Sequence, residues 1–175
     1  MRHTDHAAGA GRVPQAAVSV AAFGSVVHTL HPGDLACGTR GDRFVTLLGS
    51  CVAVVLTDPR RTVGAMCHIV HSTPNDSADR DSTWGDVALD LMYGQLRERG
   101  IEPRLCDAFV YGGGNMFPGL VPGGRHVGSA NARWVLDALA MDGIPVLHQD
   151  LGGPSYRRLS WTVGPELPQV TAGAV

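Results

Sequence analysis

The sequence has little charge of either sign and no long apolar run, and these absences remove several classes of protein. Charged residues make up 17% of the 175-residue chain, and the formal net charge is −2 at pH 7. A nucleic-acid-binding surface needs a wide basic stripe, whereas this chain has only isolated arginine pairs at 60–61 and 157–158. No apolar run approaches the roughly 18 residues that span a bilayer. We therefore expect neither nucleic-acid binding nor membrane insertion.

Cysteine is also scarce, and its spacing excludes the usual structural uses of the residue. No C-x-x-C pair of the kind that binds zinc occurs among the four cysteines, Cys37, Cys51, Cys67 and Cys106. Four are too few for the disulfide framework of a small secreted protein. The H-x-x-H pair at 68–71 would place its imidazoles on opposite faces of a strand. We expect free thiols in the cytoplasm, with no metal and no cofactor.

The remaining composition is typical of one globular domain. The apolar fraction is 44%, and 23 glycines and 11 prolines indicate many turns. Residues 1–25 are rich in alanine and glycine, and we expect them to form a flexible leader. Residues 26–175 then form a single domain whose C-terminal tail, from Gly164, is frayed.

Hydrophobic periodicity predicts the main strands and helices of this domain. Two segments, 52–57 and 63–70, are apolar on both faces, which predicts strands at the centre of a sheet. Ser129 is the expected N-cap of the later of two predicted helices, the one at 129–142. The remaining elements expected are strands at 44–48, 105–111, 144–149 and 159–163 and helices at 84–99 and 129–142.

The most informative segment is 47–51, in which a Gly-Ser pair places one cysteine next to a buried strand. Only a few per cent of an ordinary thiol is thiolate at neutral pH, because its pKa is about 8.5. His68 follows seventeen residues after Cys51, and an imidazole within reach would take the thiol proton. Cys51 and His68 are therefore the candidate nucleophile and base. The alternatives are a small buried hydrophobic residue and a core imidazole bonded to a backbone carbonyl.

Neighbouring residues are candidates for supporting roles. The hydroxyl of Thr46 could orient the imidazole, although a β-branched residue there also suits a strand. The turn at Gly49 and Ser50 exposes backbone N–H groups that could stabilise an oxyanion. The Gly-Gly-Gly-Asn run that contains Gly113 and Asn115 lacks a nucleotide-binding pattern. We expect that run to form a tight turn that brings backbone close to the site.

Five motifs occur in one order along the chain, and together they are more specific than any one of them. They are 47–54, 64–68, 111–117, Gly128 with Asn131, and 143–153. In this order they resemble the CheD family, the chemoreceptor glutamine deamidases. The resemblance implies an α/β fold, a layered sandwich of mixed β-sheet with flanking helices, similar to the catalytic domain of deamidating toxins. It also implies hydrolysis of selected receptor glutamines to glutamate with release of ammonia.

The resemblance assigns roles by position. Cys51 falls on the family's nucleophile and His68 on its base, as in a protein-glutamine glutaminase. The family's threonine lies six residues before the cysteine, where this chain has Val45, and Thr46 lies one residue closer. Either Thr46 takes that role with a shifted register or the third group is absent, because a one-residue slip turns a strand side chain to the other face. The implied partners are a methyl-accepting chemotaxis receptor and a CheC-type phosphatase.

Other functions stay open from the sequence alone. The chain could be an inactive CheD-like module that binds receptors or a CheC-type phosphatase, and Val45 is the residue that favours this interpretation. The same cysteine–histidine pair could serve a peptidase or an acyltransferase. A secreted toxin-like deamidase is a further alternative.

Overall fold

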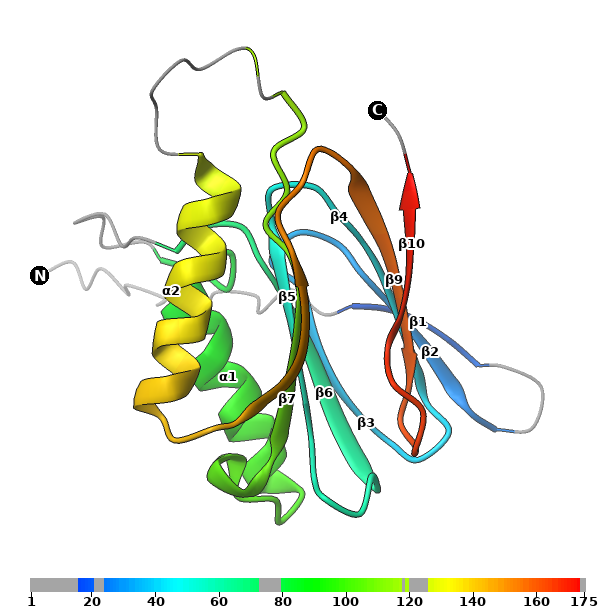
Figure 1. Cartoon of the computed structure of the whole chain (residues 1–175). Helices are drawn as coiled ribbons and strands as arrows, with labels where there is room; N and C mark the ends of the chain where they lie inside the picture. The colour runs from blue at the N-terminus through cyan, green and yellow to red at the C-terminus, as the bar shows by residue number, and fades with distance from the viewer. Residues whose placement is uncertain (1–15, 21–23, 73–79, 118, 120–125, 174–175) are drawn as a thin grey trace, which may run out of the picture.

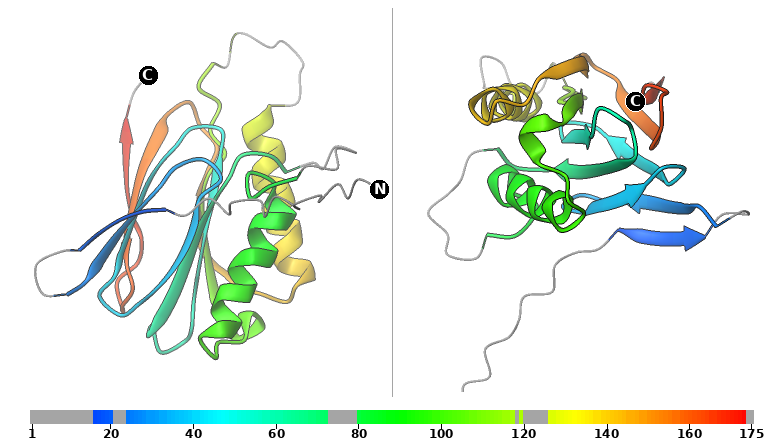
Figure 2. Two further views of the ribbon diagram at one scale, coloured as in Figure 1. Left: turned by 180° about the vertical axis from the view of Figure 1, so that it is seen from behind. Right: turned by 90° about the horizontal axis from the view of Figure 1, so that it is seen from below.

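Two β-sheets stacked face to face, with two helices on one side, form the three layers of the structure (Figure 1). The computed structural model describes residues 16–20, 24–72, 80–117, 119 and 126–173. Figure 2 shows from two further sides that both helices cover the same sheet. The expected α/β sandwich of mixed sheets is thus confirmed. None of the described helices combines the length and the apolar character needed to cross a bilayer.

The sheet away from the helices, called here the outer sheet, has five strands. In spatial order they are β1 (Ala17–Val20), β2 (Val26–Leu30), β4 (Arg43–Leu48), β9 (Tyr156–Thr162) and β10 (Gln169–Gly173). The pair β2–β4 is parallel, and the other neighbours are antiparallel. This sheet is therefore mixed.

The second sheet, called here the central sheet, lies between the outer sheet and the helices. In spatial order its strands are β3 (Leu35–Thr39), β6 (Val63–Ile69), β5 (Val52–Thr57), β7 (Asp107–Gly112) and β8 (Val146–Leu151). Only the pair β7–β8 is parallel. The covering elements are α1 (Gly85–Glu98), which packs on β3 and β6, and α2 (Val127–Met141), which packs on β5 and β8. A short 3-10 helix, η1 (Pro103–Leu105), precedes β7.

The strand β5 shows why the centre of the fold could be recognised from its sequence. All six of its residues are buried, since both faces of the central sheet are covered. Val52 and Val54 pack in the core beneath the helices, and Ala53 and Val55 pack in the core between the sheets. Alternate side chains of a strand point to opposite faces, so a doubly covered strand must be apolar throughout. The prediction of a central strand at 52–57 is confirmed.

Every strand and helix expected from periodicity is present, with ends that differ by at most about three residues, a normal uncertainty for boundaries. Four strands were not expected: β1, β2, β3 and β10. The prediction that the tail from Gly164 is frayed is wrong in part, because Gln169–Gly173 forms a strand that pairs with the edge of β9. The N-cap of α2 is His126, so the expectation of Ser129 is also wrong.

The segment expected to be a leader contains one described strand. Its Ala-Val-Ser-Val sequence at 17–20 pairs antiparallel with β2, and β-branched valines favour that conformation. The remainder of the expected leader, at 1–15 and 21–23, lies outside the described residues.

Candidate active site

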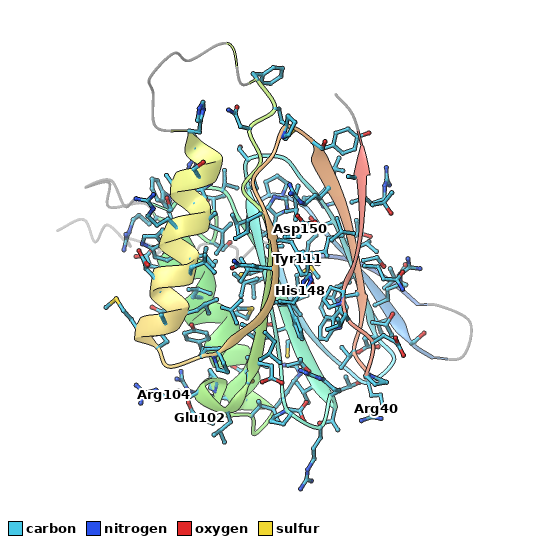
Figure 3. All side chains as sticks on the ribbon, in the orientation of Figure 1. Arg40, Glu102, Arg104, Tyr111, His148 and Asp150 are labelled. Carbon is cyan, nitrogen blue, oxygen red and sulfur yellow. The ribbon has the colours of Figure 1, made fainter. Side chains whose placement is uncertain are left out.

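Three loops meet at one end of the sandwich. They are the cysteine loop (49–51) between β4 and β5, the glycine loop (113–115) after β7, and the β8–β9 loop (152–155). Backbone hydrogen bonds connect the glycine loop to both of the others. In Figure 3 the opposite end of the molecule is marked by Arg40 and Arg104. The site is therefore built where loops of both sheets converge.

Backbone amides of the glycine loop bind the carbonyl groups of the cysteine loop. The N–H of Gly113 donates to the carbonyl of Cys51, and the N–H of Gly114 donates to the carbonyl of Gly49, both at 2.8 Å. Gly112 has φ +110°, and a Cβ there would collide with the carbonyl of Cys51. Only glycine allows both this conformation and this close approach.

A pocket of about 440 Å³ opens beside the cysteine loop. It brings together the predicted thiol, the predicted imidazole and the Gly-Ser turn. Cys51 is half-buried, whereas the other three cysteines are buried. The residues that line the pocket are Pro32, Leu47, Gly49, Ser50, Cys51, His68, Met116, Phe117 and Tyr156.

His68 reaches this pocket from β6, the strand beside β5. Ala53, two residues after Cys51, pairs with His68 in the antiparallel register of the two strands. The imidazole is 1% exposed, and its Nε2 has no hydrogen-bond partner among the described residues. A buried nitrogen without a partner is costly. Its presence on the wall of a pocket is typical of a group that works on a bound molecule.

Thr46 lies behind the imidazole, on β4 of the outer sheet. The burial pattern of β4 turns Phe44, Thr46 and Leu48 inward, while Val45 lies on the opposite face. The Oγ1 of Thr46 lies 2.8 Å from the Nδ1 of His68 and donates to the carbonyl of Leu30 at 2.8 Å. It is thus Thr46, five residues before Cys51, that contacts the imidazole.

These contacts fix the tautomer of the neutral imidazole. A hydroxyl has one proton, and that of Thr46 is donated to the carbonyl of Leu30. Its oxygen must then accept a proton from Nδ1 of His68. The lone pair of the ring is consequently on Nε2, the atom without a partner. An imidazole in this tautomer is a base toward the pocket.

Burial sets the charge state of both groups. It lowers the pKa of His68 to about 4, an effect that Asp34 opposes and that His31 reinforces. Burial likewise raises the pKa of the Cys51 thiol above its ordinary value, with partial compensation from the backbone amide of Cys51 itself. Desolvation disfavours the charged form of each group. The resting pair is therefore a neutral thiol and a neutral imidazole.

A tight turn between β2 and β3 holds the backbone of His68. The N–H of Gly33 donates to the carbonyl of His68, and the N–H of His68 donates to the carbonyl of Asp34, both at 2.9 Å. The carboxylate of Asp34 accepts the N–H of His31 at 2.8 Å and so closes the turn. Pro32, at the tip of the same turn, contributes to the pocket wall. Nothing in the sequence indicated that this turn packs on His68.

The structure separates the expected loop residues into two groups. Gly49 and Ser50 line the pocket, whereas Gly113 and Asn115 do not. The N–H of Gly113 is already bonded, and that of Asn115 donates to the carbonyl of Gly153 at 2.8 Å. Within the described part of the chain, the backbone N–H groups of Ser50 and Cys51 donate to no backbone carbonyl, and that of Cys51 faces its own sulfur. These two amides are the candidate donors to an oxyanion.

Sequence reasoning did not find the apolar wall of the pocket. Leu47 and Phe117 are 53% and 59% exposed, and Met116 and Tyr156 complete the wall. A signal for Leu47 was present, because it lies on the outward face of a strand where a polar residue is usual.

Side chains of the central and outer sheets also meet near the β8–β9 loop. The hydroxyl of Tyr111 lies 3.2 Å from Nδ1 of His148, and Arg157 pairs with Asp150 at 2.8 Å. Figure 3 shows Tyr111, His148 and Asp150 close together on β7 and β8. The ion pair joins β8 to β9 and so helps to hold the loop that carries Gly153 and borders Tyr156.

The fold and the site define a class: a layered α/β sandwich with a cysteine, a histidine and a threonine at one end. Comparison with known families gives the particular group. Residues 70–165 match the model of the family described as CheD chemotactic sensory transduction. The chain belongs to the CheD family.

Individual relatives agree with this assignment. A protein of Albidiferax ferrireducens named "Probable chemoreceptor glutamine deamidase CheD 2" is 38% identical over 138 residues, which cover 77% of this chain and 80% of the relative. A protein of Pseudomonas fluorescens named "Probable chemoreceptor glutamine deamidase CheD" is 34% identical over 134 residues, or 74% of this chain and 75% of the relative. A Shewanella oneidensis protein with the same name and the suffix 1 is 36% identical over 124 residues, covering 69% of this chain and 59% of its own length.

Proposed function

We propose that this protein hydrolyses specific glutamine side chains of chemotaxis receptors to glutamate and releases ammonia. Membership of the CheD family and the names of its relatives support the reaction and the substrate. The single observation that carries the proposal for this chain is the hydrogen bond between Thr46 and His68. It leaves Nε2 of a buried imidazole free in the pocket that contains Cys51. The cytoplasm as location and a CheC-type phosphatase as partner belong to the same proposal.

The first half of the proposed reaction forms a thioester. Nε2 of His68 takes the thiol proton as Sγ of Cys51 attacks the carboxamide carbon. The oxyanion that develops accepts hydrogen bonds from the N–H groups of Ser50 and Cys51. The imidazolium then gives its proton to the amide nitrogen, the C–N bond breaks, and ammonia leaves. The acyl group is now bound to sulfur.

The second half releases glutamate. Water enters the position that ammonia has left, and His68 takes one of its protons while the oxygen attacks the thioester. The C–S bond breaks, and the proton returns to sulfur as the thiol is restored. The net change is one amide and one water converted to one carboxylic acid and one ammonia. Thr46 keeps the imidazole in one orientation through both halves.

The test is incubation of a receptor cytoplasmic domain with the wild-type protein, followed by an ammonia assay and peptide mapping. We expect ammonia in a one-to-one ratio with glutamine-to-glutamate changes, each adding about one mass unit without chain cleavage. New peptide fragments would instead indicate a peptidase. Binding of the receptor with no ammonia would indicate the inactive module.

Replacing Thr46 by valine should lower turnover about tenfold to hundredfold, because the imidazole loses the contact that orients it. Valine keeps the shape of the side chain but leaves Nδ1 of His68 and the carbonyl of Leu30 without their partner. Thr46→Ser restores the hydroxyl and should retain most activity. The measurement is the initial rate of ammonia release.

The matched control for this prediction is Thr57→Val. Thr57 is likewise buried, on β5, and donates to the carbonyl of Val63 at 2.9 Å, at the end of the strand away from Cys51. The Thr57→Val variant should be less stable than the wild type and should release ammonia at the wild-type rate. Full activity in Thr46→Val would show that Thr46 only packs in the core and does not orient the imidazole.

The rate should persist at acidic pH to an unusual degree. His68 must be neutral to accept the thiol proton, and protonation below its pKa stops the reaction. Because burial lowers that pKa to about 4, kcat/KM should fall only near pH 4 and not near the ordinary value of about 6.5. The measurement is kcat/KM against pH, with circular dichroism at each pH to follow the fold. A fall of kcat/KM near pH 6.5, in protein that is still folded, would contradict the proposal that the base is desolvated.

A further inference from the structure

Asn131 is a polar residue on an otherwise apolar helix face. The buried face of α2 packs on the central sheet, and its other buried residues are Gly128, Ala132, Val135 and Leu139. The side chain of Asn131 is nearly inaccessible, since the residue is 1% exposed. A buried amide is costly unless it is hydrogen-bonded. Its contacts therefore show what it does in the fold.

The amino group of Asn131 bridges the two segments that carry the proposed nucleophile and base. Nδ2 donates to the carbonyl of Ser50 at 3.2 Å and to the carbonyl of Val70 at 2.9 Å. Ser50 directly precedes Cys51, and Val70 lies two residues after His68. Both N–H donors of the amide are used in this bridge.

Other contacts do not duplicate the bridge. The glycine loop fixes the carbonyls of Gly49 and Cys51, but the carbonyls of Ser50 and Val70 accept no backbone N–H from the described residues. The oxyanion donors proposed above are the N–H groups of Ser50 and Cys51. Asn131 holds the carbonyl group of Ser50, which lies between them along the chain. Among the described residues, no other side-chain hydrogen bond links the cysteine loop to the end of β6.

We propose that Asn131 is a positioning residue, which holds the thiol of Cys51 and the Ser50–Cys51 amides in register with Nε2 of His68. This inference rests on the proposed function. Asn131 touches no reacting atom and acts only through the backbone of the two segments.

The first test compares steady-state rates of Asn131→Ala and Asn131→Asp. The aspartate keeps the shape of the side chain and has no donor when it is ionised, and alanine has none at any pH. In each variant kcat should fall about tenfold to hundredfold while KM changes by less than about threefold, because misplaced groups slow the chemical step more than binding. Val135→Ala, one turn along the same buried face, is the control for a loosened helix. If it lowers kcat as much as the Asn131 variants at a similar melting temperature, Asn131 is only structural.

The second test needs no receptor. Iodoacetamide alkylation of Cys51 is followed by mass spectrometry in wild type, His68→Gln, Asn131→Ala and the double variant. His68→Gln should slow alkylation about tenfold in the wild-type background and by less than about twofold beside Asn131→Ala, since the base is no longer aligned with the thiol. An equal effect in both backgrounds would overturn the role of Asn131. A wild-type rate that does not depend on His68 would instead overturn the thiol–imidazole pair itself, and this inference with it.

Discussion

Replacing Cys51 by alanine is expected to abolish ammonia release from receptor fragments, a loss of about a thousandfold or more. The reason is that no thioester can form without the sulfur. The loss should not come from unfolding, because Cys51 is half-buried and packs against the core between the sheets without being one of its buried residues. The measurements are ammonia release and glutamate formation with receptor cytoplasmic domain, together with thermal unfolding of the variant.

The chain provides a matched control for this experiment in Cys67→Ala. Cys67 precedes His68 on β6, but its side chain points to the helix-side core and is fully buried. Burial raises its pKa to about 12, so it is a poor nucleophile. This variant should lose some stability and keep the wild-type rate. Ammonia release by Cys51→Ala at the wild-type rate would remove the amidohydrolase proposal.

Replacing His68 by glutamine should lower turnover by about 10² to 10⁴. Glutamine cannot take the thiol proton, and the raised pKa of Cys51 leaves little thiolate to react without help. It also cannot protonate the departing nitrogen. The loss should appear in kcat, and a single-turnover experiment should show slow ammonia release rather than an accumulated thioester.

His28→Gln separates this effect from the general cost of changing a buried imidazole. His28 is buried in the outer sheet, stacked on Phe44 with ring centroids 4.7 Å apart, and its ring nitrogens have no partners among the described residues. It lies outside the pocket. We expect altered stability and an unchanged rate. A His68→Gln variant that keeps the full rate would make His68 a core histidine.

The parts of the fold that the sequence predicted are those determined by local pattern. The segments 52–57 and 63–69 could be recognised because both faces are apolar and a short turn joins them. It was not visible that β4 and β5, separated by three residues, belong to different sheets. That assignment depends on pairing with distant strands, such as Thr46 with Leu159. The same reason explains why the tail strand β10 was not expected.

The candidate site shows the same division. Cys51 and His68 were chosen from residue chemistry and spacing, and both line one pocket. The choice between Val45 and Thr46 could not be made, because it depends on which face of β4 turns inward when the sheets stack. Asn131 had no predicted role, although a polar residue amid the apolar periodicity of a helix was a usable signal.

The hydrogen bond between Thr46 and His68 joins a residue of one sheet to a residue of the other. The proposed chemistry would consequently depend on the docking of two layers, because neither layer alone holds an oriented imidazole. A loosened, molten form that kept every strand but let the layers slide apart would retain the far-ultraviolet signal of the native protein. It would nonetheless be chemically silent, so turnover reports on tertiary packing and not merely on the presence of secondary structure.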